Sequence, residues 1–512
     1  MKAVAAGSCN GDDPPATQVG ASDLPPDGRL TACALVYLAL PNLLFLLGWF
    51  RIGPALLLLA VAVYLLAAAL RVLARPASPA YAPTAFVLIL LTSTLWSVFG
   101  GGSHFMYANP DWEIRDALLG DLIHANWPVY YSSAAGEPLI LRSAIGFFLP
   151  VAVFGKLFGP AHLDLAVYLW TVVGVLLFLL LLPLPGRIGW RLALSLALAV
   201  FFSGMDLVGQ FIATESWPEF PLRMEWWAPL SYPSLTNQLL WAPNHCLPIW
   251  IVTLLYWRHR QRDELFQVMA AALSLSLIWT PFAAPALLPF AAVAAIAAVR
   301  RYGWGAIPWT SCAAALAFAL PLSAFLLTDA APIQASLTSA SSPAAPGTGY
   351  ALQPFSAHTY ALFVCCEFLF LVLVLAPHVR RDKIEFWLAV FILLALPFVR
   401  LGPSNDLGLR LSTPALIVLL IVSLDILLGE KRLARRSTLW IACLFLLIGA
   451  HTAFNELWRA ATFPRRQPDY QQTLAERQGG QPAAHYVGRV DASSALGRWL
   501  LRPVPKTAIS GG

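Results

Sequence analysis

Four carboxylates gather in one short stretch of an otherwise apolar chain, DWEIRDALLGD (residues 111–121). They are Asp111, Glu113, Asp116 and Asp121. A carboxylate at the end of a membrane span can act as a general base that takes a proton from a hydroxyl group. Two of them can hold a divalent cation such as Mg²⁺ or Mn²⁺. The residue types therefore point to proton abstraction, with or without a bound cation.

A helix over residues 111–125 would give these carboxylates different surroundings. Glu113 and Asp116 would share a face at i,i+3 spacing, whereas Asp111 would lie at the N-terminus, where a carboxylate also caps a helix. We expect Asp111 to be the base, with helix capping as the alternative interpretation, and Glu113 to be a helper or cation ligand. Asp116 and Asp121 are expected to form a solvated face.

The composition indicates which elements must position these groups. Hydrophobic residues make up 58% of the 512 residues, charged residues make up 12%, and the mean hydropathy is +0.67. A soluble chain of this length could not present so little polar surface to water. The chain is therefore predicted to be an all-α, polytopic membrane protein. Its net charge of +6 is interpreted as an asymmetry between loops, and no basic run with interleaved aromatic residues indicates nucleic acid.

Thirteen apolar segments are predicted to cross the membrane, with edges good to a few residues. They are residues 30–50, 53–72, 83–100, 164–183, 189–206, 239–257, 264–281, 282–299, 306–327, 357–377, 384–399, 411–428 and 437–455. Short loops rich in Lys and Arg stay in the cytoplasm, and thirteen spans with a cytoplasmic N-terminus place every basic loop there. This count requires that residues 141–159 lie along the outer interface as a helix.

The predicted organisation has three parts. Residues 1–29 are polar and rich in Pro and Asp, and are expected to be a disordered cytoplasmic leader. Residues 30–455 form the transmembrane domain, and residues 456–512 form a tail on the outer face. Most of the seven cysteines lie inside apolar runs, so no disulfide framework is expected. The long outer loops are residues 101–163, 207–238, 328–356 and 400–410.

The chain resembles the GT-C superfamily of integral-membrane glycosyltransferases over residues 83–300. The shared pattern is an acidic residue after an early span, a short helix, the pair Trp127-Pro128, and an interfacial helix ending in KLFG (residues 156–159). Asp111 falls where these enzymes carry their catalytic Asp. The pattern departs from the family in two respects: a Trp precedes the second carboxylate, and two additional spans come before the acidic loop.

The resemblance implies a bacterial plasma-membrane enzyme that moves a sugar from a polyprenyl-phosphate donor to a cell-envelope glycan or lipid. Membrane lipids, the lipid-linked sugar and the acceptor are its expected partners; a divalent cation is the one cofactor left open. The departing phosphate needs guanidinium groups, which fork onto its oxygens. Arg410, Arg400 and Arg142 are the candidates. Arg410 could instead be an interfacial side chain paired with Asp406, and Arg142 could pair with Glu137.

Polar residues in the outer loops are candidates for contacting the substrate. Glu215, Trp217 and Glu219 place an aromatic face beside carboxylates, which suits a sugar or isoprenoid, although interface anchoring also explains the Trp. Asn244 and His245 lie at the outer end of a predicted span, where buried polar groups are usually functional. Asp406 joins these candidates through its spacing from the arginine four residues later.

Other classes of membrane protein remain as alternatives. A lipid or glycan transporter, or a flippase, would carry ionisable residues inside its spans and an internal repeat. The predicted spans are nearly free of charge and no repeat is visible, so an enzyme is favoured. A glycan polymerase or ligase, or a non-catalytic scaffold of the same fold, would also fit the outer loops.

Overall fold

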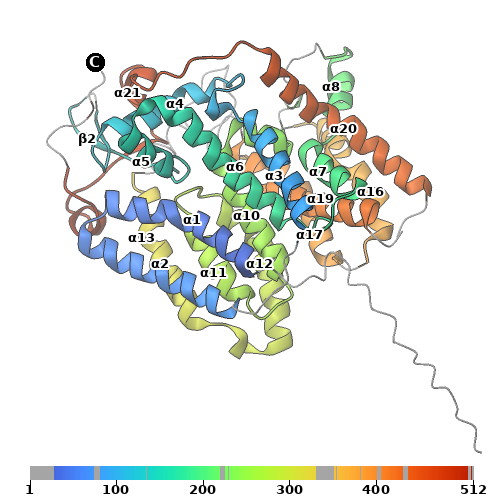
Figure 1. The fold of residues 1–512 in the computed structure, drawn as a ribbon, viewed down its shortest axis with the longest axis horizontal. Helices are drawn as coiled ribbons and strands as arrows, with labels where there is room; N and C mark the ends of the chain where they lie inside the picture. Colours follow the sequence, from blue (N-terminus) through green and yellow to red (C-terminus); the bar gives the residue numbers. More distant parts are fainter. Residues whose placement is uncertain are drawn as a thin grey trace, which may run out of the picture.

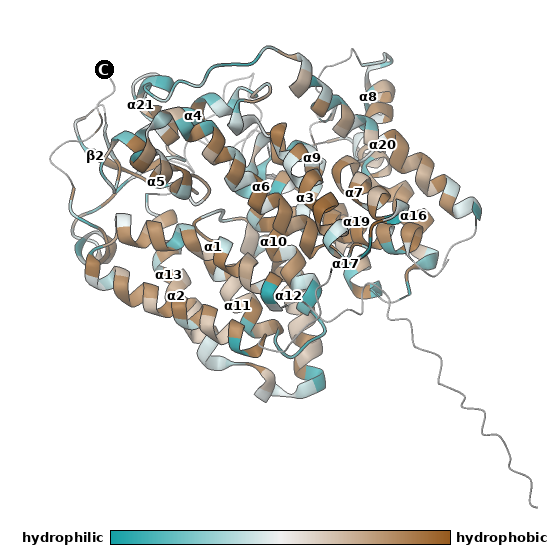
Figure 2. Ribbon diagram, in the orientation of Figure 1, coloured by the Kyte–Doolittle hydropathy of each residue, from teal (hydrophilic) through white to brown (hydrophobic). Residues whose placement is uncertain are grey.

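The computed structural model describes residues 28–73, 81–133, 135–218, 225, 227–228, 230–329, 351–352, 355–380, 382–400, 405–429, 436–504 and 509. Over these residues the chain is mostly helical, and the helices pack side by side (Figure 1). Hydrophobic residues cover most of the length of the helices (Figure 2). The predicted leader, at residues 1–29, lies almost wholly outside the described residues.

Nine helical segments of the described chain are long and apolar enough to cross a membrane. They are α1 (Gly28–Trp49), α2 (Ile52–Val72), Pro160–Leu181 with α6 (Leu163–Leu181), Trp190–Thr214 with α7 (Trp190–Phe201) and α8 (Asp206–Thr214), α12 (Ala283–Tyr302), α13 (Trp309–Leu326), Ala357–His378 with α15 (Ala357–Val364) and α16 (Phe370–Leu375), Asp406–Leu428 with α18 (Asp406–Leu411) and α19 (Thr413–Leu428), and α20 (Arg436–Thr462). The chain is therefore a multi-span helical membrane protein.

Four further segments that were predicted to cross are shorter helices. They are α3 (Pro83–Val98), α10 (Pro243–His259), α11 (Leu265–Leu275) and α17 (Lys383–Ala395). The count of thirteen spans therefore stays a prediction. Residues 141–159 contain the 11-residue α5 (Phe148–Phe158). At 1.5 Å per residue such a helix covers about half of a hydrocarbon core roughly 30 Å thick, which favours a helix that does not cross.

The chain is mostly helical, as expected, but it also contains two small sheets. Strands β1 (Tyr130–Ser132), β2 (Pro138–Leu141) and β5 (Val487–Arg489) form an antiparallel sheet in the order β1-β2-β5. This sheet ties the loop after α4 (Asp111–His124) to the C-terminal part of the chain. In Figure 1, β2, α4, α5 and α21 (Leu474–Arg477) gather at the same end of the molecule. A second pair, β3 (Ala351–Leu352) and β4 (Val399–Arg400), is also antiparallel.

The boundaries of two predicted outer segments also differ. The loop predicted at residues 207–238 contains most of α8 and the start of α9 (Leu235–Trp241). The tail predicted from residue 456 begins after α20 ends at Thr462. We use "tail" below for residues 463–504. Its expected attachment through residues 495–505 is present, because Arg502 N donates to the carbonyl of Trp49 at 2.9 Å.

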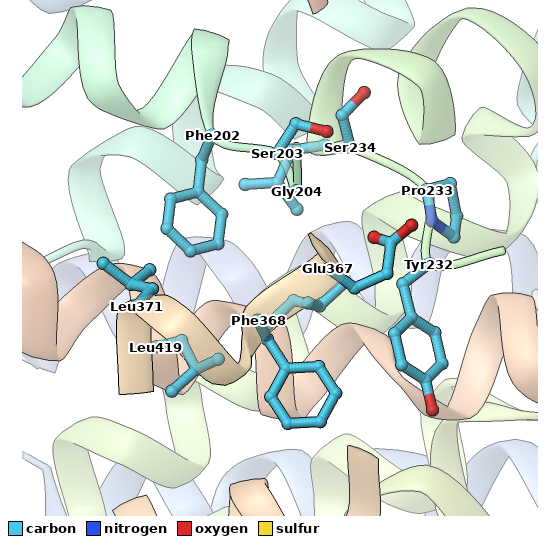
Figure 3. A pocket seen from close by; sticks show the side chains of 12 residues that line it. Phe202, Ser203, Gly204, Tyr232, Pro233, Ser234, Glu367, Phe368, Leu371 and Leu419 are labelled. Atoms are coloured by element: carbon cyan, nitrogen blue, oxygen red, sulfur yellow. The ribbon is translucent and has the colours of Figure 1, made fainter. Parts of the chain in front are cut away.

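The α15–α16 segment is interrupted by a π-helix at Cys365–Leu369. Such bulges change the direction in which side chains point and often occur at functional sites. Figure 3 shows Glu367 pointing from this turn toward Ser203 and Gly204. A Cβ on Gly204 would lie 2.6 Å from Glu367 Oε2, so only glycine lets the two segments approach this closely. Glu367 and the buried Asp206 are ionisable groups that lie within predicted spans.

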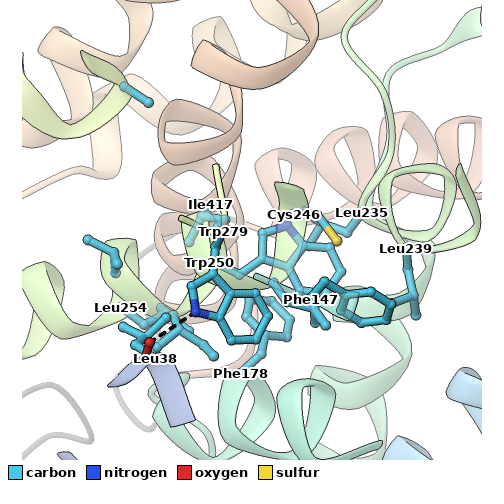
Figure 4. Close-up of a cluster of buried hydrophobic side chains, with 14 of the residues drawn as sticks. Leu38, Phe147, Phe178, Leu235, Leu239, Cys246, Trp250, Leu254, Trp279 and Ile417 are labelled. Atoms are coloured by element: carbon cyan, nitrogen blue, oxygen red, sulfur yellow. Dashed lines mark hydrogen bonds between the residues drawn. The ribbon is translucent and has the colours of Figure 1, made fainter. Parts of the chain in front are cut away.

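Large aromatic side chains around α10 form the centre of the fold (Figure 4). Trp250 lies 4.5 Å from Phe178 and stacks on Trp96 at 5.7 Å, measured between ring centroids. The indole N–H of Trp279 donates to the carbonyl of Leu38 at 3.0 Å. Because lipid tails are as apolar as these rings, close packing and satisfied N–H groups hold the helices together here.

Candidate functional site

The first turn of α4 is anchored on the end of α9. Asn109 donates to the carbonyl of Leu240 at 3.0 Å, and the indole N–H of Trp112 donates to the same carbonyl at 3.1 Å. The Trp112 ring needs glycine beside it, because a Cβ on Gly102 would lie 2.2 Å from the ring. The amide side-chain oxygen of Asn109 accepts from the backbone N–H of Asp111 at 3.1 Å. Asn109 thus provides a hydrogen-bond acceptor for the first backbone N–H of α4.

The carboxylate of Asp111 is available for chemistry. Its side chain is 51% exposed, and Oδ2 lies 3.2 Å from Nη2 of Arg115, one turn later in the helix. Arg115 also donates to the carbonyl of Trp241. The side chain of Asn109 accepts from the backbone N–H of Asp111, and the carboxylate of Asp111 contacts Arg115 instead of a backbone N–H of the helix. The capping interpretation of Asp111 is therefore wrong.

Arg410 brings a second guanidinium to this place from the other half of the chain. It lies on α18, 3.9 Å from Asp406, and interacts electrostatically with Arg115 and Asp111. Only 14% of its side chain is exposed. Its buried Nε has no hydrogen-bond partner among the described residues. A guanidinium N–H that is buried and unsatisfied is a feature of an anion-binding site.

The first turn of α10 contributes His245 and Asn244. Nδ1 of His245 lies 2.8 Å from Oγ1 of Thr280, and the ring interacts electrostatically with Arg410 and Arg115. Asn244 is buried, and its Oδ1 has no partner in the described part of the chain. The sequence-predicted residues Asp111, His245, Asp406 and Arg410 are therefore brought together. We call these four, with Arg115 and Tyr486, the Asp111 cluster.

The sequence did not single out Arg115 or Tyr486. Arg115 could have been found, because it follows Asp111 at the i,i+4 spacing of a helical ion pair. Tyr486 comes from the tail and carries no signal of its own. Burial raises the pKa of Tyr486, Arg115 lowers it, and Asp111 and Asp406 raise it, so this phenol lies within the field of the cluster.

The opposite face of α4 is covered by the tail. Asp116 lies 3.1 Å from Nε2 of His104 and accepts from Arg466 at 2.8 Å. Glu113 pairs with Arg466 at 3.7 Å and with Arg477. The expectation that Asp116 belongs to a solvated face is wrong, because it is 3% exposed. Glu113 therefore forms ion pairs with two arginines of the tail. These pairs lie on the face of α4 that the tail covers.

Asp121 is buried by the same segment and is also no part of a solvated face. It accepts from the hydroxyl of Tyr131 at 2.7 Å and from the backbone N–H of Leu474 at 2.9 Å. Burial raises its pKa to about 6, although both hydrogen bonds lower it. Through its hydrogen bond to Leu474, Asp121 therefore holds α21 against α4.

His104 lies between two carboxylates in this contact. Its Nδ1 is 3.1 Å from Asp164, whose Oδ1 also accepts from the hydroxyl of Tyr470 at 2.6 Å. Burial is the largest single effect on the pKa of His104 and lowers it. The hydrogen bonds to Asp116 and Asp164, with their charges, outweigh burial and raise the pKa to about 9. His104 is therefore a buried imidazolium that joins α4, α6 and the tail.

Arg142, a predicted phosphate ligand, supports the sheet. It is 4% exposed and donates to the carbonyls of Leu326 at 2.6 Å, Ala484 at 2.7 Å and Val487 at 3.2 Å. The alternative partner Glu137 pairs with Arg489 at 3.2 Å. The contacts of Arg142 therefore hold the tail against α13 and β2.

The remaining predicted residues are not brought to this cluster. Glu215 follows α8 in a left-handed conformation, and Trp217 is 67% exposed with its ring 4.5 Å from Phe211. In Figure 1, α8 is well separated from α4. Glu219 and the side chain of Arg400 lie outside the described residues; the backbone of Arg400 pairs with Ala351. Among the described residues, no group of three or more His, Cys, Asp or Glu side chains could hold a metal ion.

Comparison with known protein families, with curated proteins and with solved structures finds no match for this chain. Its own residues establish a multi-span helical membrane protein in which a half-exposed carboxylate of α4 and a histidine of α10 interact electrostatically with an arginine of α18.

Proposed function

We propose that this chain is a glycosyltransferase of the GT-C type, which moves a sugar from a polyprenyl-phosphate donor to a cell-envelope glycan or lipid acceptor. The observation that carries the proposal is the electrostatic interaction of Asp111 with both Arg115, its ion-pair partner, and Arg410. A transfer of this kind needs a base for the acceptor hydroxyl and cations for the departing phosphate, close together in a partly dry site.

The residues of the Asp111 cluster divide into these two roles. Asp111 accepts the proton of the acceptor hydroxyl. Its side chain is 51% exposed, compared with 12% for Arg115, so an acceptor can approach the carboxylate. Arg410 holds the phosphate through its unsatisfied Nε and its forked N–H groups. Asp406 orients Arg410 from one turn earlier. His245, fixed by Thr280, and Asn244 supply polar contacts to the sugar or the leaving group.

The proposal includes an orientation. The cluster faces the outer side of a bacterial plasma membrane, with the basic last turn of α12 (Arg300, Arg301) in the cytoplasm. On that side a lipid-linked sugar is the activated donor, because nucleotide sugars are cytosolic. Labelling a Glu137→Cys variant with a membrane-impermeant thiol reagent in intact cells checks this side; labelling only after permeabilisation would reverse it.

A transporter is the second candidate, and one observation favours it. Asp206, Glu225 and Glu367 are buried carboxyl groups in and beside the spans, which is where a transporter keeps its ionisable residues. The enzyme remains the better proposal because the arginines and the exposed carboxylate of the Asp111 cluster match a phosphate and a hydroxyl.

The test of the enzyme is transfer by the Asp111→Asn variant in lipid vesicles, with a panel of polyprenyl-phosphate sugars. Asn keeps the shape and the contact with Arg115 but cannot accept a proton. General-base catalysis is worth about 10²–10⁴-fold, so the rate should fall by roughly that factor while the melting temperature stays the same.

Glu137→Gln is the matched control for this experiment. Glu137 is 53% exposed and pairs with Arg489 at 3.2 Å, compared with 51% and 3.2 Å for Asp111 and Arg115. Both substitutions therefore neutralise a half-exposed carboxylate that lies at the same distance from an arginine. Near-normal transfer by Asp111→Asn, or an equal loss in Glu137→Gln, would remove Asp111 from the role of base.

A further inference from the structure

Three carboxyl groups meet inside the membrane domain, away from the Asp111 cluster. Asp206 opens α8, Glu225 lies in the segment after it, and Glu367 lies in the π-helical turn, so three separate segments contribute. Their exposed fractions are 1%, 1% and 5%. Three ionised carboxylates at such a place would be very unfavourable without compensating groups.

The hydrogen bonds identify which group is ionised. Asp206 accepts from the hydroxyl of Thr452 at 3.0 Å, from the indole N–H of Trp227 at 3.1 Å and from the hydroxyl of Ser203 at 3.4 Å. It is also hydrogen-bonded to Glu367. Ionised carboxylates only accept hydrogen bonds, so this last bond requires a proton. Because Asp206 already accepts from three donors, Glu367 is the group that carries it.

No cation replaces that proton within the described part of the chain. None of the three carboxyl groups forms an ion pair with a described Lys, Arg or His. The other titratable groups that face them are Glu456 from α20, Cys366 from the π-helical turn and Tyr232. Glu456 is paired with Arg459 at 2.6 Å. From α19 the cluster is faced by Leu416 and Leu419.

A small cavity beside Glu367 provides space for a water molecule that can accept its proton. Glu367 lies on its wall with Ser203, Tyr232 and Ser234, and the space holds about one water molecule (Figure 3). The buried Oε1 of Glu367 has no hydrogen-bond partner among the described residues. Glu225 accepts from the hydroxyl of Ser234, which lines the cavity, at 2.8 Å through Oε1, whereas its buried Oε2 has no partner in the described part of the chain. An unsatisfied carboxyl oxygen on the residue that lines a water-sized space points to an exchangeable ligand.

We propose that Asp206 and Glu367 form a proton-binding site inside the membrane domain, at which Glu367 exchanges its proton through the cavity and Glu225 is the second acceptor. In the exchange, the O–H bond of Glu367 breaks and an O–H bond to the cavity water, or through it to Glu225, forms. Asp206 stays ionised throughout and holds the proton on Glu367 by its charge. The site stands independently of the proposed transferase activity and would serve either candidate function.

The experiment is infrared spectroscopy of the full chain in lipid nanodiscs, which detects the carbonyl stretch of a protonated carboxyl group. At pH 7–8 exposed carboxyl groups are ionised, since their pKa values are about 4. A protonated-carboxyl band should appear in this range, and Glu367→Gln should remove it when both chains also carry Glu225→Gln, which eliminates any signal from Glu225. Glu456→Gln is the matched control, because Glu456 is equally buried but paired with Arg459, and it should keep the band.

Two further measurements test the proposal: one does not need the Glu367→Gln variant to fold, and the other tests whether the site binds a cation instead of a proton. If Glu367→Gln does not fold, an apolar carbodiimide, which modifies protonated carboxyl groups, is applied to the wild-type chain, and mass spectrometry should find the adduct on Glu367. Replacing K⁺ by Na⁺ should leave the band unchanged. The absence of the band at pH 7–8, its survival in Glu367→Gln, no adduct on Glu367, or loss of the band in Na⁺ would each overturn the proton site.

Discussion

The Asp111 cluster and the Asp206–Glu367 site use the same side-chain chemistry under opposite conditions. Asp111 is half exposed and lies beside Arg115 and Arg410, so its charge is both hydrated and balanced. Asp206 and Glu367 are buried, with hydroxyl, indole and carboxyl neighbours instead of cations. Desolvation and the absence of a counter-charge favour the protonated form, whereas exposure and paired cations favour the ionised form. The surroundings therefore favour the ionised form at Asp111 and a protonated carboxyl group at the Asp206–Glu367 site, which is the basis of the two proposed roles.

Helix α4 repeats this contrast over a single turn. Asp111 faces Arg410 and solvent, whereas Asp116 is sealed between His104 and Arg466. The first position is suited to chemistry and the second to holding the tail in place. The predictions below test this division.

The largest effect on folding is expected from Asp116→Ala. Removing one partner from a buried ion pair destabilises a protein by about 3–5 kcal/mol, because His104 and Arg466 would be left without their carboxylate. Asp111→Ala removes an exposed pair and should change stability by less than about 1 kcal/mol. Chemical denaturation of the two variants in nanodiscs measures both values. Similar losses in the two variants would show that the faces of α4 do not differ in this way.

A smaller effect is expected from Arg410→Lys, measured as binding of a polyprenyl phosphate. Lysine keeps the charge but loses the fork, and one charge-assisted hydrogen bond is worth about 1.5–3 kcal/mol, or about 10–100-fold in affinity. Arg489→Lys changes an exposed arginine outside the cluster and serves as control. Unchanged affinity in both Arg410→Lys and Arg410→Ala would take this residue out of the site.

A further effect, which is a gradual change and not a single loss, is expected from pH through His104. Its pKa is raised from 6.5 to about 9, so the folded state binds the proton more tightly than the unfolded state. The resulting stabilisation is complete below pH 6.5 and is lost as pH rises through 9. The melting temperature should therefore fall between pH 6.5 and 9. In His104→Asn, which keeps a residue tolerant of the left-handed backbone at this position, the fall should be much shallower. An equally steep fall in the variant would assign it to other groups.

The amino-acid sequence alone was enough to predict the membrane class and the residues of the Asp111 cluster that stand out chemically. Long apolar runs with few charges require helices that cross a bilayer, whatever the tertiary packing. Asp111, His245, Asp406 and Arg410 were singled out because polar residues at the ends of apolar segments are conspicuous. Asp206 and Glu367 were not singled out, because no pattern in the sequence brings them together.

The tertiary structure decided which carboxylates are covered and which remain free. Helical spacing predicted that Asp111 and Asp116 face different ways, but the face that becomes buried depends on Arg466 and Leu474, which lie more than 300 residues away along the chain. Likewise, Arg410 interacts electrostatically with Asp111 only through the tertiary structure, because the two residues are far apart along the chain. Protonation state follows from burial and neighbouring charge, and both are properties of contacts between distant segments, which local sequence patterns do not encode.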